Sequence, residues 1–464
     1  MRRVQVCNTH KQILFDDFKK LERLIKPQSI RNIYHFKPFL GFSIDSRSLK
    51  EGEGFIAVEG LHKDGHDFIN QAVSKGAVFV IGEKYVDNAL RIPFFVVDDS
   101  QRALAAIVKY IRKRKSPLVY GITGSVGKTT VKEILGFLLA PYYKVLKNRG
   151  TENNFLGLSK TILSLDDEQV VILEMGTSQK GEIETLTRIS DPDIGVITSV
   201  KPVHLEGLGC LNGVFKEKSA IFKVNPRIKA VLNINDYYLK QLKNQHSVCW
   251  FGSKRKADLF FRFTKRSQGK SVFLFQDKYR FSLPCYLESM IVNFSAAILS
   301  ARLLGIPLFE LINRAQAFNG FLPMRMELKR KNGFLILNDA YNANPYSLQQ
   351  AFSMLKQYSS QKIIVLADML ELGKKTRYYH ERIASDIVKN KFDYCLTFGV
   401  HTFYLHERLK SMGYKKTFHF SDHKTIARFI TQKIITSKRL RKRYLIFLKG
   451  SRKMKLENII SYLK

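Results

Sequence analysis

The order of apolar and polar residues predicts a small α/β unit near the start of the chain. Between residues 38 and 98, glycine turns separate short apolar runs: GFSIDSR, GFIAVEG, GAVFVIG and IPFFVVDD. Turn-bounded runs rich in β-branched and aromatic residues are typical of strands. The segment HDFINQAVSKGA lies between two of these runs and is expected to form a helix. We therefore predict an N-terminal domain over residues 1–98.

Residues 100–115 have the period of an amphipathic helix. The apolar residues at helical spacing are Ala103, Leu104, Ile107, Val108 and Ile111. Ser100 is a candidate N-cap, and the basic last turn suits the negative end of the helix dipole. The segment that follows, PLVYGITG, is predicted to be a strand.

The rest of the chain alternates predicted strands and helices. Continuous apolar runs of the buried parallel-strand type are QVVILEMG, DIGVITSV and IKAVLNIN. Residues 257–284 change to shorter, alternating strands, which predicts an antiparallel meander, and a helix is expected over 290–304. After the linker GFLPMRMELK, a further strand set follows: GFLILNDA, KIIVLADM, DYCLTFG and RYLIFLKG. The predicted fold class is α/β, with a central P-loop parallel-sheet domain over 99–322 and a Rossmann-like α/β domain over 323–464.

Composition narrows the class of protein. The chain has 464 residues, 45% of them hydrophobic, which suits globular cores and excludes a disordered protein. No apolar run is long enough to span a bilayer, and no secretory signal is expected at the basic start. The cysteines are few, far apart and without a C-x-x-C motif, which favours a cytoplasmic protein and argues against a disulfide framework or a zinc site: Cys7, Cys210, Cys249, Cys285 and Cys395.

The net charge of +37 admits two interpretations. Lysine and arginine gain free energy by releasing counterions from nucleic acid, and a basic surface equally attracts small anionic substrates. The basic runs RKRK (112–115), KRK (254–256) and KRLRKR (438–443) are scattered along the chain, and none accompanies a nucleic-acid-binding motif. We therefore expect no nucleic-acid partner.

The segment GITGSVGKTT, residues 121–130, resembles a phosphate-binding loop. It follows a predicted strand and begins a predicted helix, and its glycines let backbone N–H groups approach phosphate oxygens. It departs from G-x-x-x-x-G-K-[ST] because Ile122 stands where the first glycine is expected. The alternative is a glycine-containing turn with a chance lysine. The residues predicted to bind ATP here are Gly124, Ser125, Val126, Gly127, Lys128, Thr129 and Thr130.

Several motifs together resemble the ATP-dependent Mur ligases, which form amide bonds in peptidoglycan precursor synthesis. The loop TGSVGKTT is similar to the family pattern T-G-x-x-G-K-T-[ST], which explains the missing glycine. Further similar segments are FSIDSRSLKEGEGF, NRGTENNFLGL, VILEMGTSQKGEI, LNDAYNANPYSL, VLADMLELG and FLKGSRKMKLE. The segment DAYNANP is similar to the members that add D-alanyl-D-alanine. The resemblance extends from about residue 42 to the end of the chain.

The resemblance implies an enzyme that activates a carboxylate with ATP as an acyl phosphate, which an amine then attacks. Lys128, Glu174, His204 and Lys218 are the implied catalytic residues. Clustered phosphates require cations, and Thr129 with Glu174 is the implied first Mg²⁺ site, His204 being associated with a second metal. The alternatives are a solvated acid for Glu174 and a structural role for His204.

Lys218 matches a lysine that several Mur ligases carbamylate, but Ala220 replaces the family's nearby acid. Modification therefore stays open, and Lys218 is otherwise a charge on a solvated helix face.

In the third domain, the resemblance implies that Arg325 and Asp339 reach ATP and that Asn342 and Asn344 line the dipeptide side. The two asparagines are otherwise turn formers before a proline. Asn338 replaces a family aspartate, and Lys449 is either functional or a charge at a strand edge.

Asn293 matches an adenine-reading asparagine, although LESM (287–290) replaces the preceding G-x-H-N pattern. The remaining implied contacts are with a nucleotide-sugar peptide, through Asp45, Ser46, Arg47, Asn153 and Asn154. For SIDSRS the alternative is a plain Asx turn.

The predicted function is therefore addition of D-alanyl-D-alanine to a UDP-N-acetylmuramoyl tripeptide, with ATP and Mg²⁺, by a cytoplasmic monomer. A ligase that adds glutamate to a folate, a nucleic-acid-stimulated ATPase and a ligase-like binding protein without catalysis are the alternatives.

Overall fold

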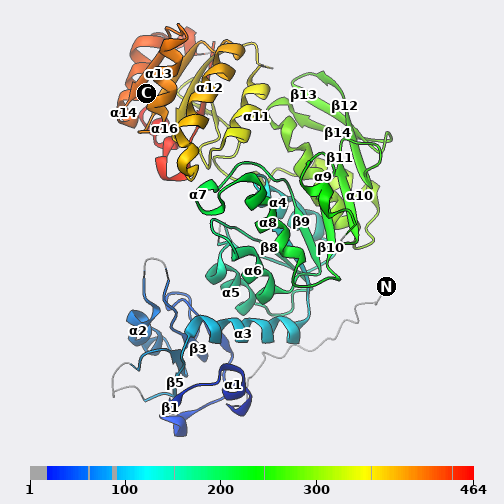
Figure 1. Cartoon of the computed structure of the whole chain (residues 1–464), viewed down its shortest axis with the longest axis vertical. Helices are drawn as coiled ribbons and strands as arrows, with labels where there is room; N and C mark the ends of the chain where they lie inside the picture. Colours follow the sequence, from blue (N-terminus) through cyan, green and yellow to red (C-terminus); the bar gives the residue numbers. More distant parts are fainter. Residues whose placement is uncertain are drawn as a thin grey trace. The chain divides into compact units, whose positions relative to one another are not determined.

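The computed structural model describes residues 18–60, 63–85, 91–150, 152–244, 246–356, 358–441 and 443–463. Cys7 and the basic start of the chain lie outside these residues. The described chain is a mixed α/β protein with three sheets (Figure 1). It divides into two compact units, the first comprising Met1–Gly121, Tyr142–Gly176 and Glu184–Asp193, and the second comprising Ile122–Pro141, Thr177–Ile183 and Ile194–Lys464.

The N-terminal sheet has five strands in the order β1-β5-β4-β3-β2. The strands are β1 (Ser29–Arg31), β2 (Gly41–Ser43), β3 (Glu53–Ile56), β4 (Val80–Gly82) and β5 (Phe94–Val96). The last four pair in parallel, and β1 adds an antiparallel edge. Helices α1 (Phe18–Ile25) and α2 (Ile69–Ser74) accompany the sheet. Phe55, Val80 and Phe94 are among the buried residues of its core.

Helix α3 (Ser100–Lys115) has the predicted bounds, but its predicted cap is wrong. Asp99 is the N-cap, since its carboxylate accepts a hydrogen bond from the backbone N–H of Arg102 (2.8 Å). Ser100 is instead buried, and both its N–H and its hydroxyl donate to Glu83 Oε1 (2.8 Å each). Two adjacent polar residues satisfied the capping pattern, and only the tertiary contact with Glu83 distinguishes them.

The central sheet has nine strands in the order β14-β13-β12-β11-β10-β9-β6-β8-β7. They are β6 (Leu118–Thr123), β7 (Val145–Lys147), β8 (Val170–Glu174), β9 (Ile194–Ile197), β10 (Lys229–Asn233), β11 (Val248–Gly252), β12 (Leu259–Ser267), β13 (Lys270–Phe275) and β14 (Tyr279–Pro284). Strands β9 to β12 pair in parallel. The predicted meander is confirmed, because β12, β13 and β14 pair antiparallel, and it continues the central sheet.

The helices of this region follow its strands in the chain. They are α4 (Lys128–Leu139), α5 (Phe155–Leu163), α6 (Glu182–Ser190), α7 (Leu205–Leu208), α8 (Leu211–Ser219), α9 (Ile291–Arg302) and α10 (Leu308–Gln316). Helix α9 confirms the helix predicted over 290–304. Within the second unit α9 packs on both α4 and α10. The helix after the phosphate loop is thus anchored by a neighbour in the same unit.

The C-terminal sheet has six strands in the order β15-β16-β20-β17-β18-β19. They are β15 (Glu327–Lys331), β16 (Phe334–Asn338), β17 (Gln361–Ala367), β18 (Tyr394–Phe398), β19 (Thr417–Phe420) and β20 (Tyr444–Lys449). All pairs are parallel except the β15–β16 hairpin. The accompanying helices are α11 (Pro345–Leu355), α12 (Thr376–Asn390), α13 (Thr402–Ser411), α14 (His423–Phe429), α15 (Lys438–Arg441) and α16 (Ile459–Tyr462). Parallel strands joined by helices agree with the predicted α/β class.

Candidate active site

The loop between β6 and α4 has the backbone of a phosphate-binding loop. Gly124 and Gly127 have positive φ values of 145° and 90°, a region that favours glycine. A Cβ on Gly124 would lie 1.9 Å from Thr198 Oγ1, and one on Gly127 would lie 2.3 Å from Asn293 Oδ1. The close approach of these two polar side chains therefore requires glycine at both positions. It also places Asn293, predicted to read adenine, directly against the loop.

Hydrogen bonds fix the loop to the segment that follows β9. The N–H of Ser125 donates to the carbonyl of Ser199 (2.9 Å), and Ser125 Oγ exchanges hydrogen bonds with the backbone of Lys201. Thr198 Oγ1 donates to the carbonyl of Val126 (2.5 Å). Lys128 Nζ donates to the carbonyl of Gly124 (2.8 Å). The loop conformation is thus set by the protein itself.

Thr129 and Arg325, both predicted to serve ATP, meet in the second unit. Arg325 Nη2 donates to the hydroxyl of buried Thr129 (2.9 Å), and the guanidinium lies 4.0 Å from the ring centre of Tyr341. Arg325 Nε is buried and has no hydrogen-bond partner among the residues that the structure describes. A stacked, partly satisfied guanidinium beside a phosphate loop is suited to an anionic ligand.

Buried Lys449 forms an ion pair with the partly buried Asp339. Lys449 Nζ contacts Asp339 Oδ2 and donates to the carbonyl of Asn342 (3.1 Å), while Asp339 Oδ1 accepts from the N–H of Met326 (3.1 Å). Lys449 is buried at the end of β20, so the alternative of a strand-edge surface charge is wrong. The pair connects the asparagine motif to the segment that carries Arg325.

His204 contacts an acid that sequence reasoning missed. It has a left-handed backbone (φ 50°) before α7, and its Nδ1 contacts the carboxylate of Glu371. This hydrogen bond lowers the pKa of Glu371. Glu371 also accepts the N–H of Glu206 through its carbonyl (3.3 Å). It lies in the segment VLADMLELG, so its motif was a signal, but its partner was not predictable.

Lys218 is 1% exposed, so the interpretation as a solvated surface charge is wrong. Burial, and then the charge of Lys128, lower its pKa well below the usual value for lysine. The adjacent Glu217 is also buried and accepts from the backbone N–H groups of Gly181 (2.7 Å) and Ile183 (2.8 Å). Lys218 therefore lies in an environment that favours a neutral amine.

In the first unit, Glu174 is buried at the end of β8, which contradicts the alternative of a solvated acid. Its Oε1 accepts from Asn153 Nδ2 (2.9 Å), and its backbone is held on both sides by Asn148 (2.9 and 3.0 Å). Asn148 begins the segment NRGTENNFLGL, but the sequence analysis assigned it no role. Asn154 caps α5, because its side chain accepts from the N–H of Gly157 (2.9 Å).

Asp45, Ser46 and Arg47 form the Asx turn that the sequence allowed as an alternative. Asp45 Oδ1 accepts from the backbone N–H of Arg47 (3.1 Å) and pairs with its guanidinium (2.9 Å), while Lys160 contacts Asp45 Oδ2 (3.0 Å). The hydrogen bond from Arg47 lowers the pKa of Asp45. Buried Ser46 donates to Gln71 Oε1 (2.6 Å). The turn holds two cations beside one carboxylate in the first unit.

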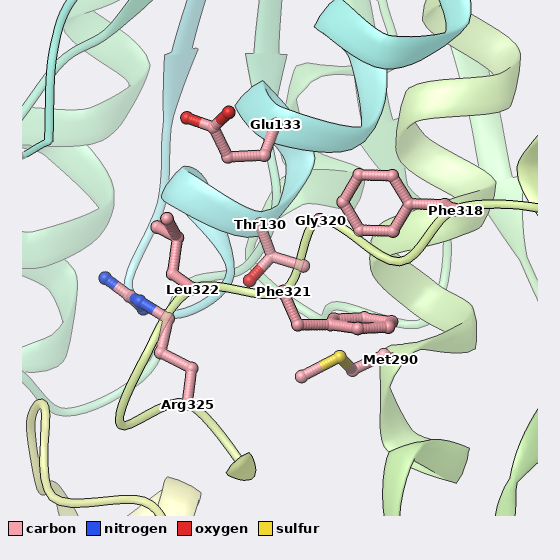
Figure 2. A pocket seen from close by; sticks show the side chains of 8 residues that line it. All are labelled: Thr130, Glu133, Met290, Phe318, Gly320, Phe321, Leu322 and Arg325. Atoms are coloured by element: carbon pink, nitrogen blue, oxygen red, sulfur yellow. The ribbon is translucent and has the colours of Figure 1, made fainter.

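A small pocket adjoins the phosphate loop (Figure 2). In this view Phe318, Phe321 and Met290 lie on one side of it, and Leu322 lies on the other with the charged groups of Glu133 and Arg325. Met290, at the start of α9, lies one helical turn from Asn293. The lining residues are Thr130, Glu133, Met290, Phe318, Gly320, Phe321, Leu322 and Arg325. The pocket therefore offers an apolar surface next to a phosphate-binding loop.

The described residues were also compared with what a metal site and a membrane-spanning helix require. Among the residues that the structure describes, no three histidine, cysteine or acidic side chains are grouped as a metal site. The hydroxyl of Thr129 and the carboxylate of Glu174 are nevertheless hard oxygen donors of the kind that Mg²⁺ prefers. No helix in the described ranges is long and apolar enough to cross a membrane.

Comparison with known proteins covers nearly the whole chain. Residues 39–118 match the Mur ligase family catalytic domain, residues 122–301 the Mur ligase middle domain and residues 324–452 the glutamate ligase domain. The UDP-N-acetylmuramoyl-tripeptide--D-alanyl-D-alanine ligase of Bacillus subtilis is 30% identical over 446 residues, which cover 94% of each chain. The ligase of the same name from Rickettsia prowazekii is 31% identical over 430 residues, covering 90% of this chain and 94% of its own.

Solved structures agree with these relatives. MurF from Acinetobacter baumannii superposes with a TM-score of 0.85 at 26% identity, covering 96% of this chain and 98% of its own. MurF from Thermotoga maritima, in complex with ADP, gives a TM-score of 0.80 at 28% identity over 91% of this chain and 96% of its own. The chain therefore belongs to the Mur ligase family. Within that family it is of the MurF type, and the predicted recognition is confirmed.

Proposed function

We propose that the chain joins D-alanyl-D-alanine to UDP-N-acetylmuramoyl-tripeptide, using ATP, in peptidoglycan precursor synthesis. The observation that carries the proposal is the loop at Gly124–Lys128, with Thr129 bonded to Arg325 and Asn293 against Gly127. In such a reaction, ATP phosphorylates the tripeptide carboxylate and releases ADP. The dipeptide amine then attacks the acyl carbon, and the amide bond forms as phosphate leaves.

The residues of the second unit have complementary proposed roles. Lys128 and Arg325 neutralise phosphate charge where it develops, and Asp339 with its partner Lys449 fixes the segment that carries Arg325. Asn293, which lies against Gly127, is the proposed contact of the adenine ring, and apolar side chains border the phosphate loop nearby. Asn342 and Asn344 line the dipeptide side, and His204 and Lys218 complete the catalytic set.

Mg²⁺ is the metal we assign to this reaction. Thr129 and Glu174 would hold it, with His204 near a second ion, and bound Mg²⁺ supplies charge neutralisation and polarisation of the transferring phosphoryl group. In the first unit, Asp45, Ser46, Arg47, Asn153 and Asn154 are the proposed contacts of the UDP-linked substrate. We expect the enzyme to act as a monomer in the cytoplasm, where ATP and UDP-linked precursors are made.

The test is coupled turnover with purified protein. With ATP, Mg²⁺, UDP-tripeptide and D-alanyl-D-alanine, phosphate and the ligated product should form in equal amounts, and omission of either acceptor or donor should stop both. Oxygen-18 in the tripeptide carboxylate should appear in the released phosphate. Lys128→Ala should reduce kcat by at least about 100-fold, since it removes a charge that acts on the transition state.

Lys113→Ala, an exposed lysine on α3, is the control and should turn over normally. Phosphate release without both substrates, or phosphate free of oxygen-18, would contradict the proposal. A second assay offers a folate and glutamate in place of the UDP-tripeptide and the dipeptide. Folylpolyglutamate synthase of Mycobacterium tuberculosis shares the fold, with a TM-score of 0.61 at 15% identity. Glutamate addition to a folate instead of dipeptide addition would identify the other type of ligase.

A further inference from the structure

Lys201 lies three residues before His204, in the segment that follows β9. Its backbone N–H donates to Ser125 Oγ (2.8 Å), and its carbonyl accepts from the same hydroxyl (3.0 Å). Its position is therefore fixed to the loop that the proposed function assigns to ATP. None of the sequence motifs assigned a role to this lysine.

The ammonium group of Lys201 has unused hydrogen-bonding capacity. It lies 3.4 Å from Asp236 Oδ2 and 4.9 Å from the ring centre of Tyr346. Across the described part of the chain, no acceptor has hydrogen-bonding geometry to this ammonium, which carries three N–H donors. The side chain is 27% exposed. A ligand can thus reach a cation that is oriented but not saturated.

Asp236 holds this cation in place and is itself satisfied by backbone groups. The buried carboxylate accepts from the N–H of Val200 (2.9 Å) and from the N–H of Tyr238 (3.1 Å). It therefore needs Lys201 for charge balance and not to complete its hydrogen bonds. The long ion-pair contact leaves the ammonium directed by Asp236 and by the face of Tyr346.

Tyr346, whose ring lies beside the ammonium of Lys201, directly follows the asparagine motif in the chain. It is the second residue of α11 and follows Asn344 and Pro345 directly. Burial raises the pKa of its hydroxyl, so the phenol stays protonated and able to donate. Lys201 therefore contacts the phosphate loop through its backbone, and its ammonium lies over a ring next to the segment proposed to line the dipeptide.

We propose that the ammonium of Lys201, oriented by Asp236 and the ring of Tyr346, binds the terminal carboxylate of the incoming dipeptide. The inference rests on the proposed function. A carboxylate removed from water requires a cation, and the amine end of the dipeptide must reach the acyl carbon near Lys128. An extended dipeptide spans about 7 Å, so its carboxylate must be bound close to the phosphate loop.

Three other cations among the described residues of the second unit already have a partner or an assigned role. Lys449 is bonded to Asp339 and to the carbonyl of Asn342. Arg325 is bonded to Thr129 and, together with Lys128, is assigned to the phosphates. Lys201 is therefore the cation whose position and free donors fit a carboxylate on the dipeptide side.

The experiment compares D-alanyl-D-alanine with D-alanyl-D-alaninamide, which lacks the carboxylate charge. For the wild-type enzyme the amide should have a KM about 10- to 100-fold higher, the value of one charge-assisted hydrogen bond. Lys201→Met should raise KM for the dipeptide by a similar factor, leave KM for ATP unchanged, and abolish the preference for the dipeptide over its amide. Lys201→Arg should retain most of the preference.

Lys115→Met is the matched control, because this lysine is 17% exposed and lies 3.5 Å from the carboxylate of Asp166 in the first unit. It should change neither KM. Thermal denaturation of each variant separates loss of binding from loss of folding. The ratio of the KM for D-alanyl-D-alaninamide to the KM for D-alanyl-D-alanine is also independent of the amount of folded enzyme.

A preference that survives in Lys201→Met, or a KM change for ATP alone, would overturn the inference and assign the lysine to the nucleotide. If the wild-type enzyme ligates neither compound, the proposed function fails instead.

Discussion

His380 shows at the scale of one residue how burial fixes a protonation state. The ring is 1% exposed in α12, Nδ1 donates to the carbonyl of Thr376 (2.7 Å), and Nε2 accepts from the N–H of Met369 (3.1 Å). A carbonyl only accepts and an N–H only donates, so the ring must be the neutral Nδ1–H tautomer. Burial lowers the pKa of His380, in agreement with this geometry.

His380 should therefore make the protein less stable in mild acid. Because its folded-state pKa is lowered, the unfolded chain binds the proton first, and stability is lost as the pH falls below about 6.5 towards the folded pKa. Its charged and titratable neighbours have opposite effects on this pKa, since Asp368 raises it and His401 lowers it. His380→Gln can make both hydrogen bonds without titrating, so its free energy of unfolding should decline less between about pH 7 and pH 5. Chemical denaturation at a series of pH values measures this, and equal slopes for both proteins would contradict the prediction.

Buried charges were the residues on which sequence reasoning left two interpretations. Glu174, Lys218 and Lys449 were each either functional or solvated, and all three are buried. A buried charge is costly unless it is paired or neutralised, which is why such groups are concentrated at functional sites. Periodicity does not reveal this burial, since each of these residues lies at the end of an element or on a short helix.

At the scale of elements, helix caps account for some predicted substrate contacts. Asn344 begins α11 with a capping box, in which its side chain accepts from the N–H of Ser347 (2.8 Å) and its own N–H donates to Ser347 Oγ (3.1 Å). Asn154 caps α5 in a simpler way. Both asparagines therefore have a structural reason to be present, and a role in binding must be tested separately from the cap.

Substitution at Asn344 separates the two roles. Asn344→Ala should lower the free energy of unfolding by about 1 kcal/mol through loss of the cap, whereas Asn344→Asp and Asn344→Ser should retain it. If the side-chain amide of Asn344 also contacts the dipeptide, as proposed, all three variants should have a KM for the dipeptide that is several-fold higher than that of the wild type. Urea denaturation and steady-state kinetics measure the two effects.

Asp422, which caps α14 through the N–H of Thr425 (2.8 Å), provides the control. Asp422→Ala should lose similar stability without a change in KM. Wild-type kinetics in Asn344→Ser would show that Asn344 is only a cap.

At the scale of the whole molecule, the charge of +37 should govern association with anionic substrates. Basic proteins attract anions over a distance set by ionic screening, so the effect is on the association rate and not on the chemical step. Raising NaCl from about 50 mM to about 500 mM should lower kcat/KM for the UDP-tripeptide by roughly tenfold and change kcat much less. Sucrose of equal osmolality is the control. A kcat/KM independent of salt would mean that the charge has no part in substrate capture.

The sequence alone determined the α/β class, the meander and the extent of α3 apart from its cap, and it identified the candidate phosphate loop. These features depend on local patterns, namely hydrophobic period, turn residues and a motif confined to ten residues. Its motifs also identified the family. The predicted domain boundaries and the roles of the site residues stay predictions.

Only the tertiary structure decided which side chains meet. The contacts of Arg325 with Thr129, His204 with Glu371 and Lys449 with Asp339 join residues more than a hundred positions apart. The choice of Asp99 over Ser100 as cap likewise depended on Glu83, and the environment of Lys201 on α11. Local sequence fixes backbone preference, whereas long-range contacts arise when separate elements bury their apolar faces together, which no short window of sequence contains.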